Sequence, residues 1–262
     1  MKSVSVVIPS IGRLSIFNAI DSVLCQSLEP EQIIVILSSP GIQSTLVNRY
    51  GGRANLEIHI NPGGTAASNR NLGILLTTAD FVAFLDDDDF WHPKKLEIQM
   101  HYTSHDVISC KAKFVGFLNG VRPTRLFEVG VLSSLYPSRI PIRRKFSLPT
   151  PTLVIRSSIA RDVLFDERLK EREDIWFLHK LEEAGCKFVQ IEDVLVTVNT
   201  RKPLSDRQVS LLSDIDWFTR LERVRKGLGA NFFWGVALRN RAFAGDFKGL
   251  FKLIIWYSRN KG

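Results

Sequence analysis

Four consecutive aspartates at positions 86–89 are the residues of this chain best suited to chemistry. They directly follow an apolar run at 81–85, so they stand close to buried structure, where four carboxylates repel one another unless a cation neutralises them. Carboxylate oxygens suit Mg²⁺ or Mn²⁺, and these ions share their coordination shell with substrate phosphates. The alternative interpretation is a solvated acidic turn, or a cap for the helix that follows.

Strand and helix patterns alternate over the first third of the chain. Runs rich in β-branched or apolar residues predict strands at 4–8, 33–37, 56–60 and 81–85. Apolar residues at helical spacing predict a helix through Ile16 and Leu24 and another over 66–78. Strands separated by helices indicate right-handed crossovers and a mostly parallel sheet, in which ligands bind beyond the carboxyl ends of the strands. The aspartates lie at such an end.

The remainder of the chain is less regular. A Pro- and Arg-rich stretch runs from about residue 119 to 151. Further elements are predicted as strands at 153–155, 187–191 and 194–198, and as helices at 157–164 and from about Asp174 onward. The tail from about residue 205 has helical character. We therefore expect an α/β domain over residues 1–204 and a helical C-terminal extension over 205–262.

The composition limits the class of protein and its surroundings. Lys and Arg exceed Asp and Glu by 35 − 27, a net charge of +8, which suits a phosphate-rich ligand, an anionic membrane surface or nucleic acid. The three cysteines are widely spaced, which argues against a disulfide framework and fits a reducing compartment. No apolar stretch approaches the roughly 20 residues that span a bilayer. We expect a cytoplasmic protein, with the inner face of the membrane as a further location.

The aspartates belong to a set of motifs with a family resemblance. Residues 81–93, which contain them, resemble the metal-binding segment of family 2 glycosyltransferases. The other matching segments are an opening strand at 6–10, a first helix end at 22–27, an Arg-Asn-x-Gly helix start at 69–74, and acidic motifs at 165–167 and 173–174. Each motif is weak by itself, but their order over about residues 3–200 is specific. The resemblance implies a GT-A fold and an inverting, metal-dependent transfer of a sugar from a nucleotide diphosphate to an acceptor hydroxyl.

The resemblance implies roles on the donor side of the site. Asp88 would bind the divalent metal, Mg²⁺ or Mn²⁺. The residues that would line the nucleotide pocket, or lie beside the ribose and phosphates, are Pro9, Ser10, Arg70, Asp86 and Asp87. An arginine at a helix start is about as often a surface residue, so the role of Arg70 depends on the resemblance.

On the acceptor side, the resemblance assigns Asp174 as the general base and Glu173 as a residue that orients the acceptor. A carboxylate would accept the proton of the acceptor hydroxyl as its oxygen attacks the anomeric carbon. A single in-line displacement would then invert the anomeric centre. Acidic residues also suit the first turn of a helix, and this capping role is compatible with catalysis.

One departure from the family concerns the nucleotide base. The family usually ends its second strand with paired aspartates, one of which recognises the base, often uracil. Here the corresponding positions are Ser38 and Ser39, and residues 36–41 contain no carboxylate. Serine hydroxyls can still hydrogen-bond a base. UDP is the leading donor nucleotide, and dTDP and GDP remain alternatives.

Two basic regions bear on the acceptor. The arginines and the lysine of residues 139–145 could hold an anionic acceptor such as a lipid-linked diphosphate, or form a solvated loop. The tail interleaves aromatic and basic residues, which suits either a helix at a membrane interface or packing against the catalytic domain. A peripheral membrane location would suit a lipid-linked saccharide acceptor in surface polysaccharide synthesis.

Two other classes of protein share some of these features. A sugar nucleotidyltransferase also combines an α/β nucleotide fold with acidic metal ligands, but it opens with a Gly-rich, basic phosphate loop that residues 9–13 match poorly. A basic nucleic-acid-binding module would account for the net charge. It would leave the aspartates without a role, and the sequence has no helix-turn-helix or zinc-finger pattern. We therefore expect an enzyme with no nucleic-acid partner.

Overall fold

The computed structural model describes residues 2–116, 120–121, 148–169, 171–200, 211–224, 228–233, 237 and 246–260. The chain divides into two compact units, which are described in turn. The first comprises Met1–Thr124 and Ser147–Asn199, and the second comprises Arg125–Phe146 and Thr200–Gly262. The domain boundary expected at residue 204 and the basic residues of 139–145 lie outside the described residues.

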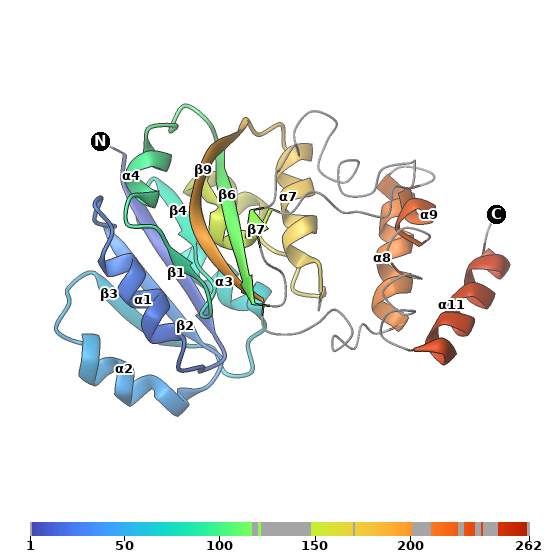
Figure 1. Ribbon diagram of the computed structural model, residues 1–262, viewed down its shortest axis with the longest axis horizontal. Coiled ribbons are helices and arrows are strands. Elements are labelled where there is room, and N and C mark those ends of the chain that lie inside the picture. The colour runs from blue at the N-terminus through green and yellow to red at the C-terminus, as the bar shows by residue number, and fades with distance from the viewer. Residues whose placement is uncertain are drawn as a thin grey trace. The chain divides into compact units, whose positions relative to one another are not determined.

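The first unit is built on a mixed β-sheet (Figure 1). Its parallel half contains β1 (Val4–Ser10), β2 (Gln32–Leu37), β3 (Leu56–Ile60) and β4 (Phe81–Phe84). β1 lies between β2 and β4, β3 pairs with the other side of β2, and these three pairings are parallel. The four predicted strands are thereby confirmed. Every residue of β1, β2 and β4 is buried, which explains why these strands carry apolar residues on both faces instead of alternating apolar and polar ones.

The sheet continues beyond β4 in the order β8, β6, β9, β5. These strands are β8 (Val154–Arg156), β6 (Val107–Gly116), β9 (Phe188–Thr200) and β5 (Phe90–Trp91), and β7 (Gly120–Val121) pairs with β6. β8 is antiparallel to both β4 and β6, and β5 is antiparallel to β9. The helix-flanked α/β sheet is as predicted. Its second half adds antiparallel pairings that an alternation of strands and helices does not reveal.

Two elements of this second half differ from the prediction. The sequence predicts separate strands at 187–191 and 194–198, but β9 is one continuous strand. Glu192 and Asp193, which suggest a break between the two, are exposed side chains on the strand. β6 is not among the predicted elements, because its lysines alternate with buried apolar residues and no apolar run stands out.

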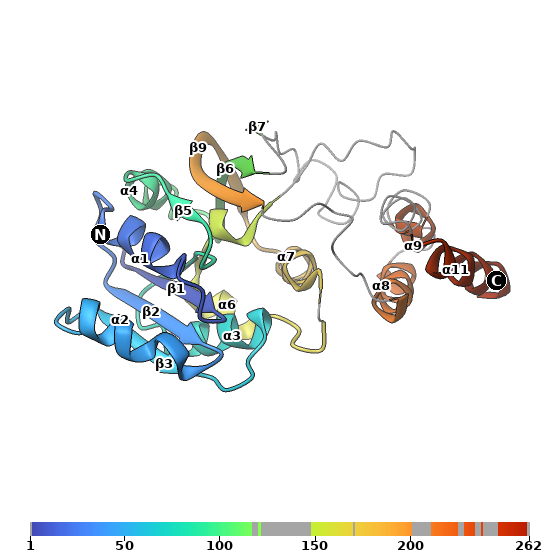
Figure 2. The same cartoon turned by 60° about the horizontal axis from the view of Figure 1, so that its bottom comes forward.

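Helices cover both faces of the sheet, and Figure 2 shows α1 and α4 on one side with α3 and α6 on the other. The helices of the first unit are α1 (Ile16–Leu24), α2 (Gln43–Tyr50), α3 (Ala66–Leu76), α4 (Lys95–Met100), α6 (Ser157–Val163) and α7 (Glu173–Glu183), with short 3₁₀ turns η1 (Pro40–Ile42) and η2 (Thr150–Thr152). Val6 and Ile8 of β1 belong to the hydrophobic core that includes residues of α1, α2 and α4.

The position of α3 depends on Gly73. A Cβ atom at this residue would lie 2.3 Å from Cγ1 of Val7 in β1. A residue without a side chain therefore allows α3 to approach the sheet this closely. The approach brings the first half of α3 beside the carboxyl ends of the parallel strands, where Asn69 and Arg70 line a pocket.

From residue 211 onward, the described residues of the second unit lie almost entirely in helices, as predicted for the tail. Its helices are α8 (Leu211–Val224), α9 (Leu228–Phe232) and α11 (Phe247–Asn260). The rings of Phe233 and Tyr257 stack with their centroids 4.0 Å apart, and Phe218 meets Trp256 edge-on. Phe251 of α11, in contrast, is exposed. Among the helices that the structure describes, none is long and apolar enough to cross a membrane.

Candidate active site

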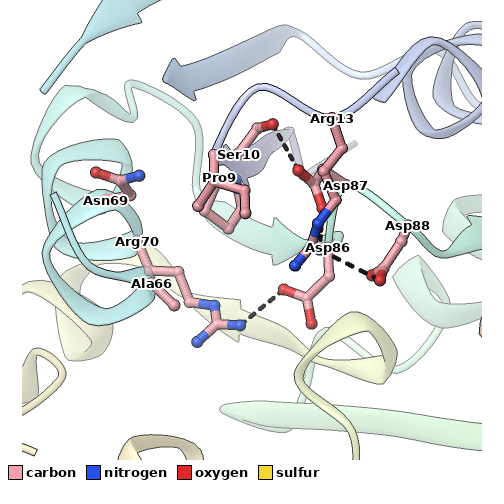
Figure 3. A pocket seen from close by; sticks show the side chains of 10 residues that line it. Pro9, Ser10, Arg13, Ala66, Asn69, Arg70, Asp86, Asp87 and Asp88 are labelled. Carbon is pink, nitrogen blue, oxygen red and sulfur yellow. Dashed lines mark hydrogen bonds and ion pairs between the residues drawn. The ribbon is translucent and has the colours of Figure 1, made fainter. Parts of the chain in front are cut away.

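A pocket opens at the carboxyl ends of β1 and β4 (Figure 3). The structure brings together here most of the residues implied by the family resemblance, namely Pro9, Ser10, Arg70, Asp86, Asp87 and Asp88. The other lining residues are Ile11, Arg13, Ala66 and Asn69. The pocket has the location expected for the ligand site of an open parallel sheet.

Ser10 and Asp87 are hydrogen-bonded to each other at one side of this pocket. Ser10 Oγ donates to Asp87 Oδ2 at 2.6 Å, and the backbone N–H of Gly12 donates to Ser10 Oγ at 2.9 Å. Nη1 of Arg13 donates to Asp87 Oδ1 at 2.9 Å and to Asp88 Oδ2 at 3.3 Å. Both oxygens of the buried Asp87 are thus engaged in fixing the loop after β1, whereas the Asp88 carboxylate is partly exposed and faces the pocket.

Arg70 joins the pocket to the acidic start of α7. Its Nη2 donates to Asp86 Oδ1 at 2.7 Å, and its Nη1 donates to Glu173 Oε1 at 3.0 Å. The guanidinium also lies over the ring of Phe165, 5.4 Å from the centroid. Burial alone would lower the pKa of Arg70, but the charges of Asp86 and Glu173 outweigh it and raise the pKa. Arg70 is therefore a buried cation held by two carboxylates, and not a surface residue.

Asn71, the next residue of α3, holds the segment that precedes α7. Its Nδ2 donates to the carbonyl of Phe165 at 2.9 Å and to Glu167 Oε1 at 2.8 Å, and its Oδ1 accepts the N–H of Phe165 at 2.7 Å. The ring of Phe165 stacks on Phe177 of α7 with centroids 3.9 Å apart. Residues 70–71 of the predicted Arg-Asn motif thus connect the pocket with the acidic motif at 165–167 and with α7.

Glu173 and Asp174 form the first turn of α7. The residue before them, Arg172, has a φ of 64°, a left-handed conformation that is uncommon for a residue other than glycine and is often found at functional sites. Burial and the charge of Glu173 raise the pKa of Asp174 to about 6, against the opposing charge of Arg70. A carboxyl group with this pKa is ionised at neutral pH, yet it accepts a proton more readily than an ordinary aspartate.

Asp89 differs from the three aspartates before it. It is buried, and its Oδ1 accepts the backbone N–H of Asn199 in β9 at 2.8 Å, while the side-chain amide of Asn199 donates to the carbonyl of Asp88. Burial and the charge of Asp86 raise the pKa of Asp89 to about 8, so this carboxyl is mostly protonated at neutral pH. The expected repulsion among four carboxylates is thus relieved in part by the protein itself, because two arginines pair with the other three.

The other three aspartates, at positions 86–88, offer carboxylate oxygens that suit a divalent metal ion. Asp86 and Asp88 both line the pocket and are partly exposed. In the part of the chain that the structure describes, no three His, Cys, Asp or Glu side chains are grouped so as to hold a metal by themselves. Mg²⁺, however, is commonly bound by one or two carboxylates and completes its shell with water and substrate phosphates. Such an ion fits this donor set, with Asp88 as the predicted ligand.

Two polar lining residues, Arg13 and Asn69, are given no role by the sequence analysis. Asn69 Oδ1 accepts from Asn61 Nδ2 at 2.9 Å, Asn69 Nδ2 donates to Ser38 Oγ at 2.9 Å, and Ser38 Oγ donates to the carbonyl of Gly64 at 2.7 Å. Ser38, at the position of the family's usual base-recognising aspartate, thus belongs to an uncharged network that reaches the pocket. The signal that could have identified Arg13 is a basic residue three positions after a strand that ends at the pocket.

Known glycosyltransferases are similar to this chain. The sequence model of the family described as Glycosyl transferase family 2 matches residues 5–157, more than half of the chain. The amylovoran biosynthesis glycosyltransferase AmsB of Erwinia amylovora is 28% identical over 209 residues, which cover 74% of this chain and 68% of that protein. The pre-mycofactocin glycosyltransferase of Mycobacterium tuberculosis is 29% identical over 214 residues. That alignment covers 78% of this chain but only 44% of the relative, so the chain spans less than half of that protein.

A solved structure shares the fold. The crystal structure of residues 1–349 of Staphylococcus aureus TarS in complex with UDP-GlcNAc superimposes with a TM-score of 0.65 and 19% sequence identity, over 94% of this chain and 71% of that chain. The predicted GT-A-type α/β fold is thereby confirmed. Together with the match over residues 5–157, these findings show that the chain belongs to glycosyl transferase family 2 and is a glycosyltransferase.

Proposed function

We propose that this glycosyltransferase moves a sugar from a nucleotide diphosphate sugar to an acceptor hydroxyl, with inversion at the anomeric carbon. The observation that carries the proposal is the double ion pair of Arg70, which links Asp86 in the pocket to Glu173 beside Asp174. One guanidinium spans the two groups of acidic residues, so the donor pocket and the candidate base share one site.

Asp174 is the proposed general base. Its pKa of about 6 leaves it ionised at neutral pH, so it can accept the proton of the acceptor hydroxyl as the oxygen attacks. Glu173, held by Arg70 at 3.0 Å, is positioned to orient the acceptor. Attack from the face of the sugar opposite the leaving diphosphate inverts the anomeric centre.

Asp88 is the proposed ligand of Mg²⁺ or Mn²⁺. A bound divalent ion would stabilise the negative charge on the departing diphosphate. Asp86, fixed by Arg70, and Asp87, fixed by Ser10 and Arg13, would lie beside the ribose and phosphates of the donor. These contacts keep the chain between 86 and 88 in one conformation, which limits the reorganisation needed when the donor binds.

The proposed donor nucleotide is UDP. The support is the fold shared with TarS, whose crystal structure contains UDP-GlcNAc. The base would meet the neutral network of Ser38, Asn61 and Asn69 in place of a carboxylate, and amide and hydroxyl groups can offer both donors and acceptors to a base. Binding of dTDP or GDP in preference to UDP would correct this part of the proposal.

The proposed acceptor is a saccharide carried on a lipid, in the synthesis of a surface polysaccharide. The support comes from two relatives, the amylovoran biosynthesis glycosyltransferase above and the poly(ribitol-phosphate) β-N-acetylglucosaminyltransferase TarP of Staphylococcus aureus, which is 29% identical over 139 residues. In the helical extension proposed for residues 205–262, the exposed Phe251 of α11 stands near the exposed Lys248 and Lys252 along the helix. Such a surface suits contact with an anionic membrane at its inner face.

The experiment that tests the function separates chemistry from donor binding. Asp174→Asn should reduce transfer by about 10²–10⁴-fold, the usual contribution of a general base, while UDP binding with Mn²⁺ stays close to that of the wild type. The readout is release of UDP from a panel of UDP-sugars, with polyprenyl-diphosphate-linked saccharides as acceptors. Asp162→Asn, on the exposed side of α6, is the matched control and should leave turnover unchanged. Wild-type turnover in Asp174→Asn would remove this residue from the mechanism.

A further inference from the structure

Arg13 is a cationic side chain in the pocket to which the family resemblance gives no role. It contacts both Asp87 and Asp88 through Nη1. Its side chain is 44% exposed, compared with 6% for Arg70, the other arginine of the pocket. One arginine is therefore fixed inside the protein, and the other has room to change its contacts.

The loop that carries Arg13 is held in place by its backbone. Gly12 has a φ of +91°, in the region that favours glycine, and its N–H is hydrogen-bonded to Ser10 Oγ. Figure 3 shows the side chain of Arg13 reaching from this loop toward Asp87 and Asp88. The base of the side chain is thus anchored, while its guanidinium lies at the edge of the pocket.

The guanidinium has donors to spare. Arginine offers five N–H groups in a planar fork, and the contacts with Asp87 and Asp88 use those of Nη1. The pocket is lined by three ionisable carboxylates and two guanidinium groups, a balance that repels a diphosphate until further positive charge faces it. A cation that binds Asp88 would supply charge and would also take up the Asp88 oxygen that Arg13 contacts.

We propose that Arg13 binds the diphosphate of the nucleotide donor and competes with the divalent cation for the carboxylate of Asp88. This inference rests on the proposed function. When a cation binds Asp88, Arg13 stays paired with Asp87 and turns its remaining N–H groups to the phosphate oxygens, which a guanidinium fork matches in geometry. The cation and the nucleotide consequently bind with positive coupling, because each favours the arrangement that the other requires.

Calorimetric titration of Arg13→Met tests both halves of the proposal. Mn²⁺ alone should bind the variant about two- to five-fold more tightly than the wild type, the scale of a partly exposed ion pair. UDP in the presence of Mn²⁺ should bind about ten-fold or more weakly, because a charged hydrogen bond to the phosphates is lost. UMP, which lacks the second phosphate, should lose less affinity than UDP.

Arg49→Met is the matched control. Arg49 is 53% exposed and pairs with Asp21 at 2.6 Å, so its loss changes the net charge equally, away from the lining residues of the pocket. It should leave Mn²⁺ and UDP affinities unchanged. Arg13→Lys keeps the charge but not the fork, and should recover part of the UDP affinity; it also replaces Arg13→Met if thermal melting shows that variant to be unfolded.

Unchanged UDP affinity in the Arg13 variants, with or without a tighter Mn²⁺ site, would refute the role of Arg13 in donor binding and leave the proposed function standing. Unchanged Mn²⁺ affinity would refute the competition at Asp88. If the wild-type protein binds no nucleoside diphosphate in the presence of Mn²⁺, the proposed function fails, and this inference fails with it.

Discussion

Replacement of Arg70 by methionine should affect both stability and catalysis. Arg70 is buried, and it holds Asp86 at 2.7 Å and Glu173 at 3.0 Å. Removing one partner of a buried ion pair typically costs about 3–5 kcal/mol, because a buried charge is left uncompensated. Asp86 and Glu173 keep some access to solvent, so we expect a loss at the lower end, about 3 kcal/mol.

The same replacement should move the pH dependence of catalysis. Burial and the charge of Glu173 raise the pKa of Asp174 to about 6, and the positive charge of Arg70 opposes this rise. An adjacent opposite charge shifts a carboxyl pKa by about 1–3 units, so without Arg70 the pKa of Asp174 should reach about 7 or more. For a shift of one unit, the ionised fraction of Asp174 falls about two-fold at pH 7 and about nine-fold at pH 5.

The assay is the profile of kcat/KM from about pH 5 to 9, together with urea denaturation of the same samples. Arg156→Met is the control, because Arg156 also pairs with a carboxylate, Asp106 at 3.0 Å, and also lies over a ring, that of Phe81 at 4.9 Å. Arg156 lies at the opposite end of β4. Its loss should therefore reduce stability, while the acidic limb of the pH profile should stay at the wild-type pH. An acidic limb at the wild-type pH in Arg70→Met would refute the electrostatic link between Arg70 and Asp174.

Three further predictions concern metal binding, a buried amine and a close helix contact. Asp88→Ala should weaken UDP binding only when Mn²⁺ is present, and an unchanged Mn²⁺ dependence in calorimetry would contradict its proposed role as ligand. Lys95 is buried without a hydrogen-bond partner for Nζ among the described residues, 3.8 Å from the centroid of Trp91, and burial lowers its pKa to about 7. Between about pH 7 and 10 the unfolded chain then binds more protons than the folded protein, so the free energy of unfolding should rise with pH over that window. Urea denaturation at several pH values should show this rise in the wild type and not in Lys95→Met. Gly73→Ala should destabilise the protein by about 1–3 kcal/mol, because its Cβ would overlap Val7, and Val7→Ala in the same chain should recover much of the loss.

The sequence predicts the parallel half of the sheet well because β1, β2 and β4 are buried on both faces. Such strands leave a continuous apolar run that few other structures produce. β6 and β9 do not form such a run, because exposed polar residues interrupt their apolar pattern. Their pairing depends on contacts between residues far apart in the chain, which a local pattern does not contain.

Ordered motifs predict six of the residues that line the pocket, and the structure gathers them in one place. The motifs do not reveal how their charges are balanced. The pairing of Arg13 with Asp87 and Asp88, and the protonated state of Asp89, depend on burial and on partners from distant segments. Ion pairs of this kind require the folded arrangement, so they become visible only in the structure.

The contacts of Asn199 bear on where this protein can be shortened. Asn199 is the last residue of the first unit, and its backbone N–H and side-chain amide hold Asp89 and the carbonyl of Asp88. A truncation placed even a few residues earlier would delete the anchor of residues 88–89 along with the C-terminal helices. A loss of donor binding in such a fragment would then report damage to the pocket rather than a contribution from the helices removed. Fragments designed to isolate the catalytic unit should therefore retain the chain through Asn199.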